Sequence, residues 1–348
     1  MKRRTFMLSC LLSAIADATP QYAKVLRGLA LQFPRDHGAH PDFRTEWWYV
    51  TGALDLPRKV IGFQLTFFRV RTGFAEALAS PIAASQILFA HAAVTLPGDR
   101  LLHADRAARA NLGAGFSATD CDVHIGAWQM QRSASDVFKL KMQDAQFAFD
   151  FSLTPTQPKM LQGDAGFSQK GARAEQASYY VTWPQLQVEG SIVLDGKSQA
   201  ARGKAWFDHE WSSEVLGEAD VGWDWLGINL ADGGALMAFR IRDAAGATVF
   251  AHATLRDAAG RTRTWSGNDM QFKALRMWRS ARGTEYPVET ELRFGPHVIC
   301  TKPTIDDQEL STRRPAPVTY WEGLVQVEGT LTGRGYLELT GYAGKIVL

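Results

Sequence analysis

The chain has 348 residues, of which 46% are hydrophobic and 21% charged, with 31 Gly and 11 Trp. This composition is that of a globular protein, and it excludes a disordered, collagen-like or coiled-coil chain. The formal net charge is +2, and most of the excess lies in the first four residues. A chain that is otherwise nearly neutral offers no basic surface, so nucleic acid is not an expected partner.

The N-terminal residues have the pattern of an export signal. Residues 2–4 are basic, residues 6–15 are apolar, and residues 16–18 read Ala-Asp-Ala, the small-x-small pattern of a cleavage site. We expect a signal peptide over residues 1–18 and a periplasmic or secreted mature protein. The adjacent arginines fit either the twin-arginine or the ordinary secretory pathway. No apolar run is long enough to cross a bilayer as a helix, so the chain is not expected to span a membrane.

Two cysteines, Cys121 and Cys300, remain beyond the predicted signal. They are either one disulfide of an oxidising compartment or two buried small hydrophobic residues. Neither lies in a Cys-x-x-Cys or Cys/His spacing, so no structural zinc site is expected.

Strict alternation of apolar and other residues predicts β-strands. It occurs over residues 61–67, 138–142, 147–153 and from residue 236 onward. The tetrapeptide Asp-Ala-Ala-Gly occurs twice between such runs, at 243–246 and 257–260, and predicts hairpin loops that end in glycine. Regularly spaced strands and turns indicate an all-β sandwich or barrel.

A faint internal repeat indicates two domains. The aromatic run 47–54 leads to Phe-Arg-Val-Arg at 68–71, and the run 223–230 leads to Phe-Arg-Ile-Arg at 239–242. The alternative is a coincidence of two short aromatic strands. The spacing predicts an N-terminal domain over residues 30–200 and a C-terminal domain over residues 201–348, divided near the polar turn at 195–198.

The densest polar and aromatic cluster lies at residues 206–213. In an extended strand Trp206, Asp208 and Glu210 share one face, and Phe207, His209 and Trp211 share the other. Two carboxylates beside an imidazole could supply a general acid and set its protonation state. The alternative is a strand end with a hydrogen-bonded core histidine and solvated acids.

A second cluster covers residues 36–49. His37 and His40 could be metal ligands beside Asp36 and Asp42, but Gly38 and Pro41 predict a loop that does not present both rings together, so no metal is expected. Arg44 and Glu46 are two apart and could share a face at a closed mouth. Arg69 or Arg240 is then a candidate partner for the acid, or a solvated strand residue.

Several enzyme motifs are missing from the sequence. There is no Gly-x-Ser-x-Gly elbow, no Gly-x-Gly-x-x-Gly loop and no P-loop. Nucleotide and dinucleotide cofactors are therefore not expected. A barrel rich in Trp and Phe is suited to an apolar ligand.

Three motifs resemble those of the AttH/CrtC family. They are residues 40–52 (HPDFRTEWWYVTG), 206–211 (WFDHEW) and 222–225 (GWDW), and the likeness runs from about residue 30 to the C-terminus. The resemblance implies two tandem lipocalin-like, calycin-type antiparallel β-barrel domains. The family includes carotenoid 1,2-hydratases (hydroxyneurosporene synthases), cyclases of natural products and predicted secreted hydrolases. AttH-type members are associated with ABC transport systems.

The resemblance also implies site residues. The His-x-Trp pair of the hydratases falls on His209 and Trp211, but their later Tyr-x-Asp pair has no counterpart in residues 236–240 (LMAFR). Asp208 or Glu210 would then replace the missing acid. We expect an exported protein that binds a hydrophobic small molecule or lipid near the contact of its barrels, without a cofactor or metal. The expected ligand-binding residues are Glu46, Trp47, Trp48, Trp206, Trp223 and Trp225, and the expected catalytic residues are Asp208, His209, Glu210 and Trp211.

Two other functions stay open at this point. One is an enzyme of the same architecture, a carotenoid hydratase-like lyase or a cyclase-like catalyst with an Asp208 or Glu210 acid. The other is a protein-interaction module for a membrane transporter.

Overall fold

A computed structural model describes residues 21–346 except residues 58, 75, 77, 79, 81, 82 and 314. Their regular structure is almost entirely β, with two single-turn 3-10 helices, η1 (Arg35–His37) and η2 (Gly267–Asp269). The expected export signal at residues 1–18 lies outside the described residues. Neither of the helices in the described part is long and apolar enough to cross a membrane.

The first domain is an antiparallel barrel in which eleven of the described strands form a closed ring. Pairing of β9 with β12 closes the ring, from Thr154 opposite Gln187 to Phe147 opposite Leu194. One neighbouring pair, β4 and β5, is parallel. The strands are β1 (Thr45–Leu56), β2 (Lys59–Arg71), β3 (Gln86–Leu96), β4 (Arg100–Ala110), β5 (Gly113–Phe116), β6 (Asp122–Ile125), β7 (Trp128–Arg132), β8 (Phe138–Gln143), β9 (Phe147–Thr154), β10 (Met160–Leu161), β11 (Phe167–Gln169), β12 (Ala177–Leu194) and β13 (Lys197–Glu214).

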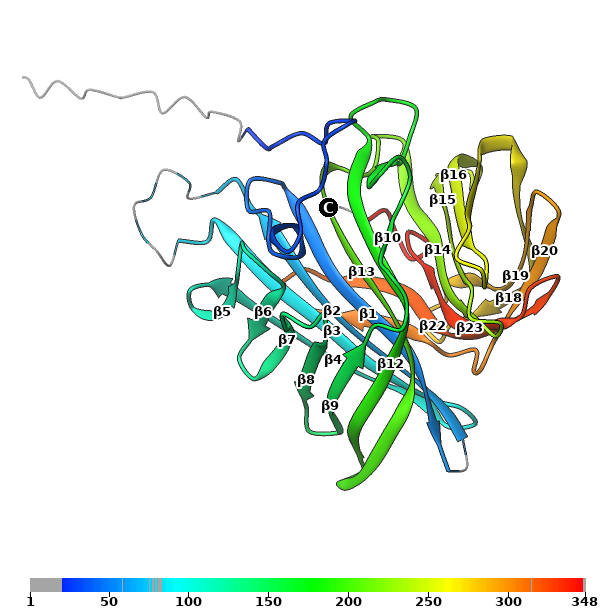
Figure 1. Cartoon of the computed structure of the whole chain (residues 1–348), viewed down its shortest axis with the longest axis horizontal. Coiled ribbons are helices and arrows are strands. Elements are labelled where there is room, and N and C mark those ends of the chain that lie inside the picture. The colour runs from blue at the N-terminus through cyan, green and yellow to red at the C-terminus, as the bar shows by residue number, and fades with distance from the viewer. Residues whose placement is uncertain are drawn as a thin grey trace, which may run out of the picture.

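The second domain is a curled antiparallel sheet that lies beside the long strands of the barrel (Figure 1). Its order is β17-β16-β15-β14-β23-β22-β20-β19-β18, with β21 paired to β22. The two expected Asp-Ala-Ala-Gly hairpin loops are confirmed, and their last residues, Gly246 and Gly260, have positive φ. The strands are β14 (Asp220–Leu230), β15 (Ala235–Asp243), β16 (Thr248–Arg256), β17 (Thr262–Ser266), β18 (Met270–Arg279), β19 (Glu285–Phe294), β20 (His297–Pro303), β21 (Glu309–Thr312), β22 (Val318–Gly329) and β23 (Gly333–Leu339).

The chain passes from the first sheet to the second between Glu214 and Asp220. The division expected between residues 200 and 201 therefore falls inside β13. Because β13 pairs with both β1 and β12, the cluster at residues 206–213 belongs to the first domain and lies beside the aromatic run of β1.

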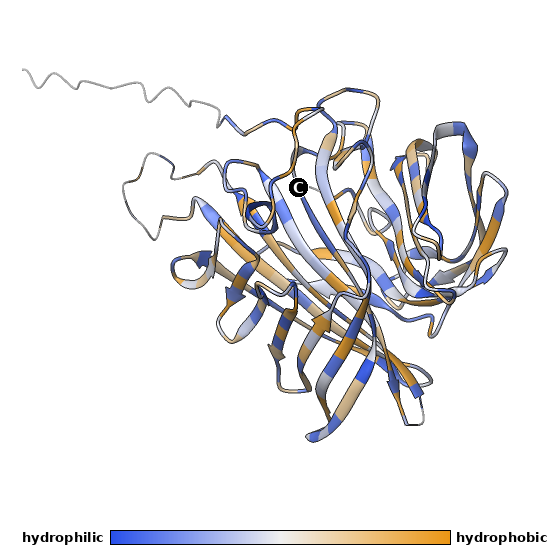
Figure 2. Cartoon of the chain, viewed as in Figure 1, coloured by the Kyte–Doolittle hydropathy of each residue, from blue (hydrophilic) through white to orange (hydrophobic). Residues whose placement is uncertain are grey.

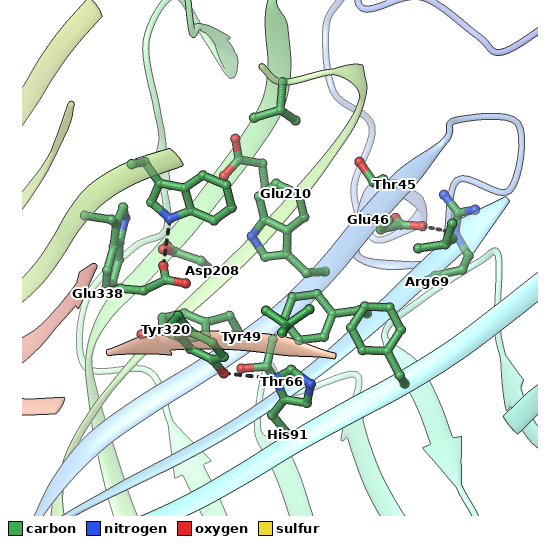
Figure 3. Close-up of a pocket in the computed structure, with 18 of the residues that line it drawn as sticks. Thr45, Glu46, Tyr49, Thr66, Arg69, His91, Asp208, Glu210, Tyr320 and Glu338 are labelled. Carbon is green, nitrogen blue, oxygen red and sulfur yellow. Dashed lines mark hydrogen bonds and ion pairs between the residues drawn. The ribbon is translucent and has the colours of Figure 1, made fainter. Parts of the chain in front are cut away.

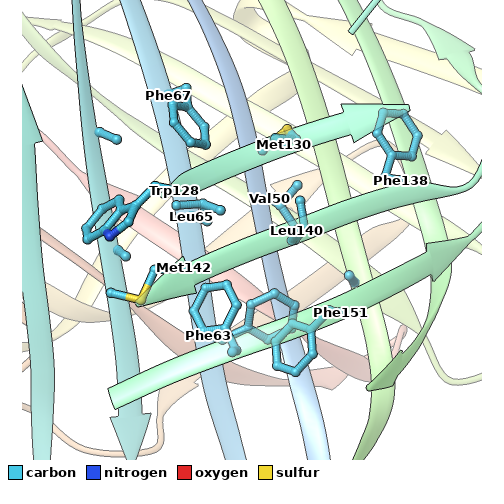
Figure 4. Packing of buried hydrophobic residues seen from close by; sticks show 14 of the residues in the cluster. Val50, Phe63, Leu65, Phe67, Trp128, Met130, Phe138, Leu140, Met142 and Phe151 are labelled. Atoms are coloured by element: carbon cyan, nitrogen blue, oxygen red, sulfur yellow. The ribbon is translucent and has the colours of Figure 1, made fainter. Parts of the chain in front are cut away.

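Each domain has its own hydrophobic core, as the alternating pattern predicts. Hydrophobic and hydrophilic residues alternate along many strands (Figure 2), so one face of each can be buried. The barrel core contains Val50, Phe63, Phe67, Trp128 and Phe151 (Figure 4). The curled sheet encloses a second core.

A third cluster joins the two domains. It includes Tyr49 and Trp206 of the barrel and Trp225, Phe239 and Leu324 of the curled sheet. A barrel has an outer face, and here the outward side chains of β1 and β13 become a buried surface because the second domain covers them.

Two backbone features allow this close contact. Gly62 of β2 faces the second domain, where a Cβ atom would lie 2.4 Å from the Tyr336 hydroxyl. Gln185 has positive φ at a bulge in β12, and its side-chain amide donates to the carbonyls of Leu230 (3.0 Å) and Gly234 (2.7 Å). The bulge thus fixes the second domain by hydrogen bonds as well as by packing.

Candidate functional site

A cavity of about 290 Å³ lies between the barrel wall and the second domain. Figure 3 shows side chains of both domains around it: Asp208 and Glu210 come from β13, Thr66 and His91 from the barrel strands β2 and β3, and Tyr320 and Glu338 from the second domain. The apolar part of the lining is mainly aromatic. It comprises Trp47, Tyr49, Phe68, Phe89, Tyr180, Trp223, Trp225, Phe239 and Tyr320, with Val70, Ile87, Val215, Ile241, Pro315, Ala316 and Val318.

The alternation of β13 decides which predicted residues reach this cavity. Asp208 and Glu210 line it, and Trp206 is buried against Trp225 at the domain contact. His209 and Trp211 lie on the opposite face of β13, at the end of the barrel. The expected division of residues 206–211 between two faces is confirmed.

Asp208 is a buried carboxyl group in an apolar wall. It accepts hydrogen bonds from Tyr180 (2.6 Å), Thr182 (2.7 Å) and the indole of Trp206 (2.9 Å). Burial raises the pKa of Asp208 to about 7, although these three donors oppose the rise. The Trp225 indole donates to the Tyr180 hydroxyl at 2.9 Å and so holds Tyr180 in place. A carboxyl group with this pKa can act as an acid near neutral pH.

Of the two β13 acids in the cavity wall, only Glu210 has a cationic partner among the residues that the structure describes. Lys170 lies 2.7 Å from its carboxylate, and Ser178 also donates to it. The Lys170 ammonium lies 4.1 Å from the ring centre of Phe239, a cation–π contact. Lys170 is thereby neutralised inside the lining rather than left free for an anionic ligand.

Two further acids come from the second domain. Glu322 on β22 and Glu338 on β23 are direct cross-strand partners and share a face. Tyr49 donates to Glu322 at 2.6 Å, Gln64 also donates to it, and the Trp223 indole donates to Glu338 at 3.0 Å. Burial raises the pKa of Glu338 to about 7 and that of Glu322 well above its usual value.

His91 completes the polar groups of the wall. It lies on β3, its Nδ1 atom is 2.9 Å from the Tyr320 hydroxyl, and burial lowers its pKa to about 3. The imidazole is therefore neutral at physiological pH.

A second polar cluster fills the end of the barrel behind Glu46. Glu46 is fully buried and accepts from Arg69 Nε (2.7 Å), His40 Nδ1 (2.7 Å) and His209 Nε2 (2.9 Å). Burial alone would raise the pKa of Glu46, but Arg69 and the histidine hydrogen bonds hold it well below its usual range. Of the two candidate partners from the sequence, Arg69 pairs with Glu46, and Arg240 pairs with Asp224 instead.

The same cluster contains a potential set of metal ligands. Ligand atoms of His40, Glu46 and His209 lie within 4.8 Å of one another. Both imidazoles already hydrogen-bond to Glu46, and the permanently charged Arg69 guanidinium contacts the same carboxylate. A divalent cation would have to displace these contacts and lie beside a fixed positive charge. The arrangement fits a buried ion-pair cluster better than a metal centre.

The cluster also fixes the segment before β1. His40 stacks on Trp211 with ring centres 3.8 Å apart, and the His37 carbonyl accepts from the Trp48 indole at 3.1 Å. His209 stacks on Trp48 at 4.9 Å. These aromatic residues therefore pack the barrel end and the loop over it.

The structure thus separates the predicted site residues into two groups. The group that lines the cavity consists of Glu46, Trp47, Asp208, Glu210, Trp223 and Trp225. The group with other contacts consists of Trp48, Trp206, His209 and Trp211, which pack in the barrel end or the domain contact. Sequence reasoning missed His91, Lys170, Tyr180, Glu322 and Glu338. The available signal was the alternation of Tyr320 and Glu322 on an apolar strand, but it does not show which surface those side chains face.

The two cysteines beyond the expected signal are free. Cys121 is buried in the barrel core, where burial raises its thiol pKa well above the usual value, and Cys300 lies on β20 of the second domain. Of the two alternatives from the sequence, the structure has separate thiols.

The fold and cavity define a two-domain lipocalin-like β-protein with a buried, largely aromatic site between its domains. A family model described as AttH-like matches residues 24–342, and the chain belongs to this family. No curated protein sequence matches it.

Solved structures agree with this assignment. A crystal structure described as an AttH from Nitrosomonas europaea is 44% identical, with a TM-score of 0.85 over 92% of this chain and 99% of that chain. Kievitone hydratase from Nectria haematococca is 16% identical, with a TM-score of 0.68 over 94% and 97%. CghA with Sch210972 is 13% identical, with a TM-score of 0.53 over 86% and 89%. The last two likenesses show the fold alone.

Proposed function

We propose that the protein binds an apolar small molecule or lipid in the interdomain cavity. The observation that carries this proposal is the mainly aromatic lining between two separately packed domains. Burial of apolar ligand surface would supply the main part of the affinity, at about 25 cal/mol for each Å² removed from water. Asp208, Glu210, Glu322 and Glu338 would bind polar groups of the ligand.

The charges of the wall restrict the ligand class. The only lysine in the described lining, Lys170, is paired with Glu210, and Arg69 is paired with Glu46. An anionic ligand would meet several carboxyl groups without an unpaired cation. A neutral or cationic apolar molecule fits this wall better.

Native mass spectrometry with solvent extraction tests the binding proposal on protein purified from the periplasm of its own host. The expected result is a co-purifying apolar compound that is lost from an Ile241→Glu variant, which places a charge in the lining. A matched Ile346→Glu variant carries the same change outside the cavity and should retain the compound. If the same compound were extracted in equal amount from both variants, its binding site would lie outside the interdomain cavity.

A second function, acid catalysis in the same cavity, is favoured by Asp208. Its buried carboxyl group has a pKa near 7 and lies in the wall with the aromatic rings of Tyr180 and Trp225. We infer a hydratase-type reaction, as in the name of the structurally similar kievitone hydratase. This acid would be Asp208 itself, since the chain lacks the Tyr-x-Asp pair of the carotenoid hydratases.

The inferred reaction balances without a cofactor. The Asp208 O–H bond breaks as its proton forms a C–H bond with one alkene carbon, leaving a carbocation stabilised by the aromatic faces. Water then forms a C–O bond with the cation, and the proton released from that water returns to the Asp208 carboxylate. The reverse sequence eliminates water.

Turnover of the extracted compound distinguishes the two functions. An enzyme should incorporate ¹⁸O from labelled water into the product, and Asp208→Asn should lower kcat by at least about 100-fold. Asp150→Asn, on the exposed side of β9, should leave kcat unchanged. A compound that binds but is recovered unaltered, without label, would favour the carrier function.

We also propose export through the N-terminal signal and a functional link to an ABC transport system. Support comes from the basic, apolar and small-residue pattern of residues 1–18 and from the AttH-like family. Fractionation of host cells tests the first point. Co-purification of a defined ABC transporter subunit with the tagged native protein tests the second.

A further inference from the structure

His91 has a hydrogen-bonding atom that no described residue satisfies. The side chain is 3% exposed and lines the cavity from β3. Its Nδ1 atom contacts Tyr320, but its Nε2 atom has no hydrogen-bond partner within the described part of the chain. A buried polar atom without a partner is costly, and most such atoms in folded proteins are satisfied by protein, water or ligand.

The neighbours of Tyr320 determine what this free nitrogen can do. The hydroxyl of Tyr320 hydrogen-bonds to the Glu322 carboxyl group, and with its proton directed to a carboxyl oxygen it also accepts from the Gln64 amide at 3.4 Å. Its oxygen then accepts the Nδ1 proton of the neutral His91 ring. In this tautomer the Nε2 atom carries a lone pair and is an acceptor that requires an O–H or N–H donor.

The surroundings of His91 are flat and apolar. Phe68 and Phe89 stack at 4.6 Å between ring centres, and their centres lie 5.2 and 5.7 Å from that of His91. All three rings line the cavity. If the donor group of a ligand reached Nε2, the neighbouring ligand atoms would contact these rings. Those ligand atoms should therefore be apolar or aromatic.

We propose that His91 is a ligand-binding residue whose Nε2 atom accepts a hydrogen bond from a hydroxyl group of the ligand. The ligand class is then an apolar molecule, aromatic or planar near its hydroxyl group. Tyr320 and Glu322 are positioning residues, since they fix the tautomer of His91. This inference rests on the proposed binding function, which it deepens by naming the hydroxyl group and its partner.

Two matched probes test the inference. 2-Naphthol and 2-methoxynaphthalene have the same rings, but only naphthol has an O–H donor. Isothermal titration calorimetry of the full-length protein gives a dissociation constant for each probe. The ratio of the two constants is the selectivity for naphthol over the ether. The His91→Phe variant keeps a flat ring and removes the acceptor, and His297→Phe is the matched control because His297 lies on β20 outside the cavity lining.

The expected result is a loss of selectivity for naphthol over the ether of about fivefold in His91→Phe, the range of one neutral hydrogen bond. The control should keep the wild-type ratio. Unchanged selectivity in His91→Phe would overturn the inference while leaving the binding function in place. Absence of binding of both probes to the wild-type protein would count against both.

A measurement on the wild-type protein covers the case in which His91→Phe does not fold. ¹⁵N NMR of the histidine rings should show that the His91 ring is neutral with an unprotonated Nε2 atom. The His91 signals are assigned as those that change in ¹⁵N-labelled Tyr320→Phe. The Nε2 signal should move on addition of 2-naphthol and not on addition of the ether. A protonated Nε2 atom in the free protein, or no movement with naphthol, would overturn the inference.

Discussion

Glu322 and Glu338 lie directly opposite each other on β22 and β23 at the domain contact, where Glu322 is buried and Glu338 is half-buried. Like charges in directly opposed positions of a sheet destabilise it. Among the described residues, no Lys, Arg or His nitrogen lies within 4.0 Å of either carboxylate. The pair therefore retains a proton at a pH where surface glutamates have lost theirs.

Replacing one member of this pair should stabilise the protein, and more at high pH. The pKa of Glu338 is raised to about 7, so the folded state gains stability from its protonation at low pH and loses it as the pH rises from about 4.5 to 7. Glu338→Gln removes that loss. We expect its free energy of unfolding to exceed the wild-type value by about 2–3 kcal/mol at pH 8 and by much less at pH 5.

Urea unfolding at the two pH values measures this difference. Glu189→Gln, on the exposed part of β12, is the matched control and should change stability by less than about 0.5 kcal/mol. A Glu338→Gln variant less stable than the wild type at pH 8 would mean that the two carboxyl groups stabilise the contact as anions.

Replacing Glu46 in the buried pair of Glu46 and Arg69 should have the opposite effect and destabilise the protein. Glu46→Gln leaves the charge of Arg69 unpaired inside the barrel. The free energy of unfolding should therefore fall by about 3–5 kcal/mol. The pKa of Glu46 is lowered, so its stabilisation is present above about pH 4.5, the value of the unfolded chain, and is lost as the pH falls through the folded value.

Thermal unfolding between pH 3 and pH 7 measures this dependence. The difference in stability between the wild type and Glu46→Gln should shrink toward pH 3. An exposed pair supplies the control: Glu328→Gln, which breaks the contact with Lys302, should leave the stability nearly unchanged at all of these pH values. A constant difference across the range would show that Glu46 contributes by packing and not by charge.

Strand alternation made half of this site predictable from the sequence. The positions of Asp208 and Glu210 opposite His209 and Trp211 follow from a period of two, and the all-β fold follows from the same signal. Which face meets the second domain does not follow, because both faces of β13 carry aromatic residues. His91 and Tyr320 are 229 residues apart and meet only because the two domains pack together, a contact that no local pattern encodes.

The location of His209 leads to a prediction that separates structure from chemistry. Its ring is fully buried in the barrel end, hydrogen-bonded to Glu46 and stacked on Trp48, and does not line the cavity. His209→Ala should therefore lower the free energy of unfolding by about 2–4 kcal/mol through lost packing and hydrogen bonds. The affinity for an apolar probe, measured at a temperature where the variant is folded, should stay within about twofold of the wild type. Loss of affinity in a folded variant would show that the barrel end and the cavity are coupled.

The pKa of Asp208 sets the pH dependence of any acid catalysis in the cavity. The proposed step uses the protonated carboxyl group, which is the main form below pH 7 because burial raises the pKa to about 7. For a substrate without titratable groups, kcat/KM should be constant below this value and fall about tenfold for each pH unit above it. Tyr180→Phe removes a donor that stabilises the anion, so the descending limb should move to higher pH, and it should stay in place in a Tyr22→Phe control at the exposed N-terminal segment. A limb that moves to lower pH in Tyr180→Phe would mean that Tyr180 does not stabilise the anion, and a rate that increases with pH would mean that the carboxylate acts as a base.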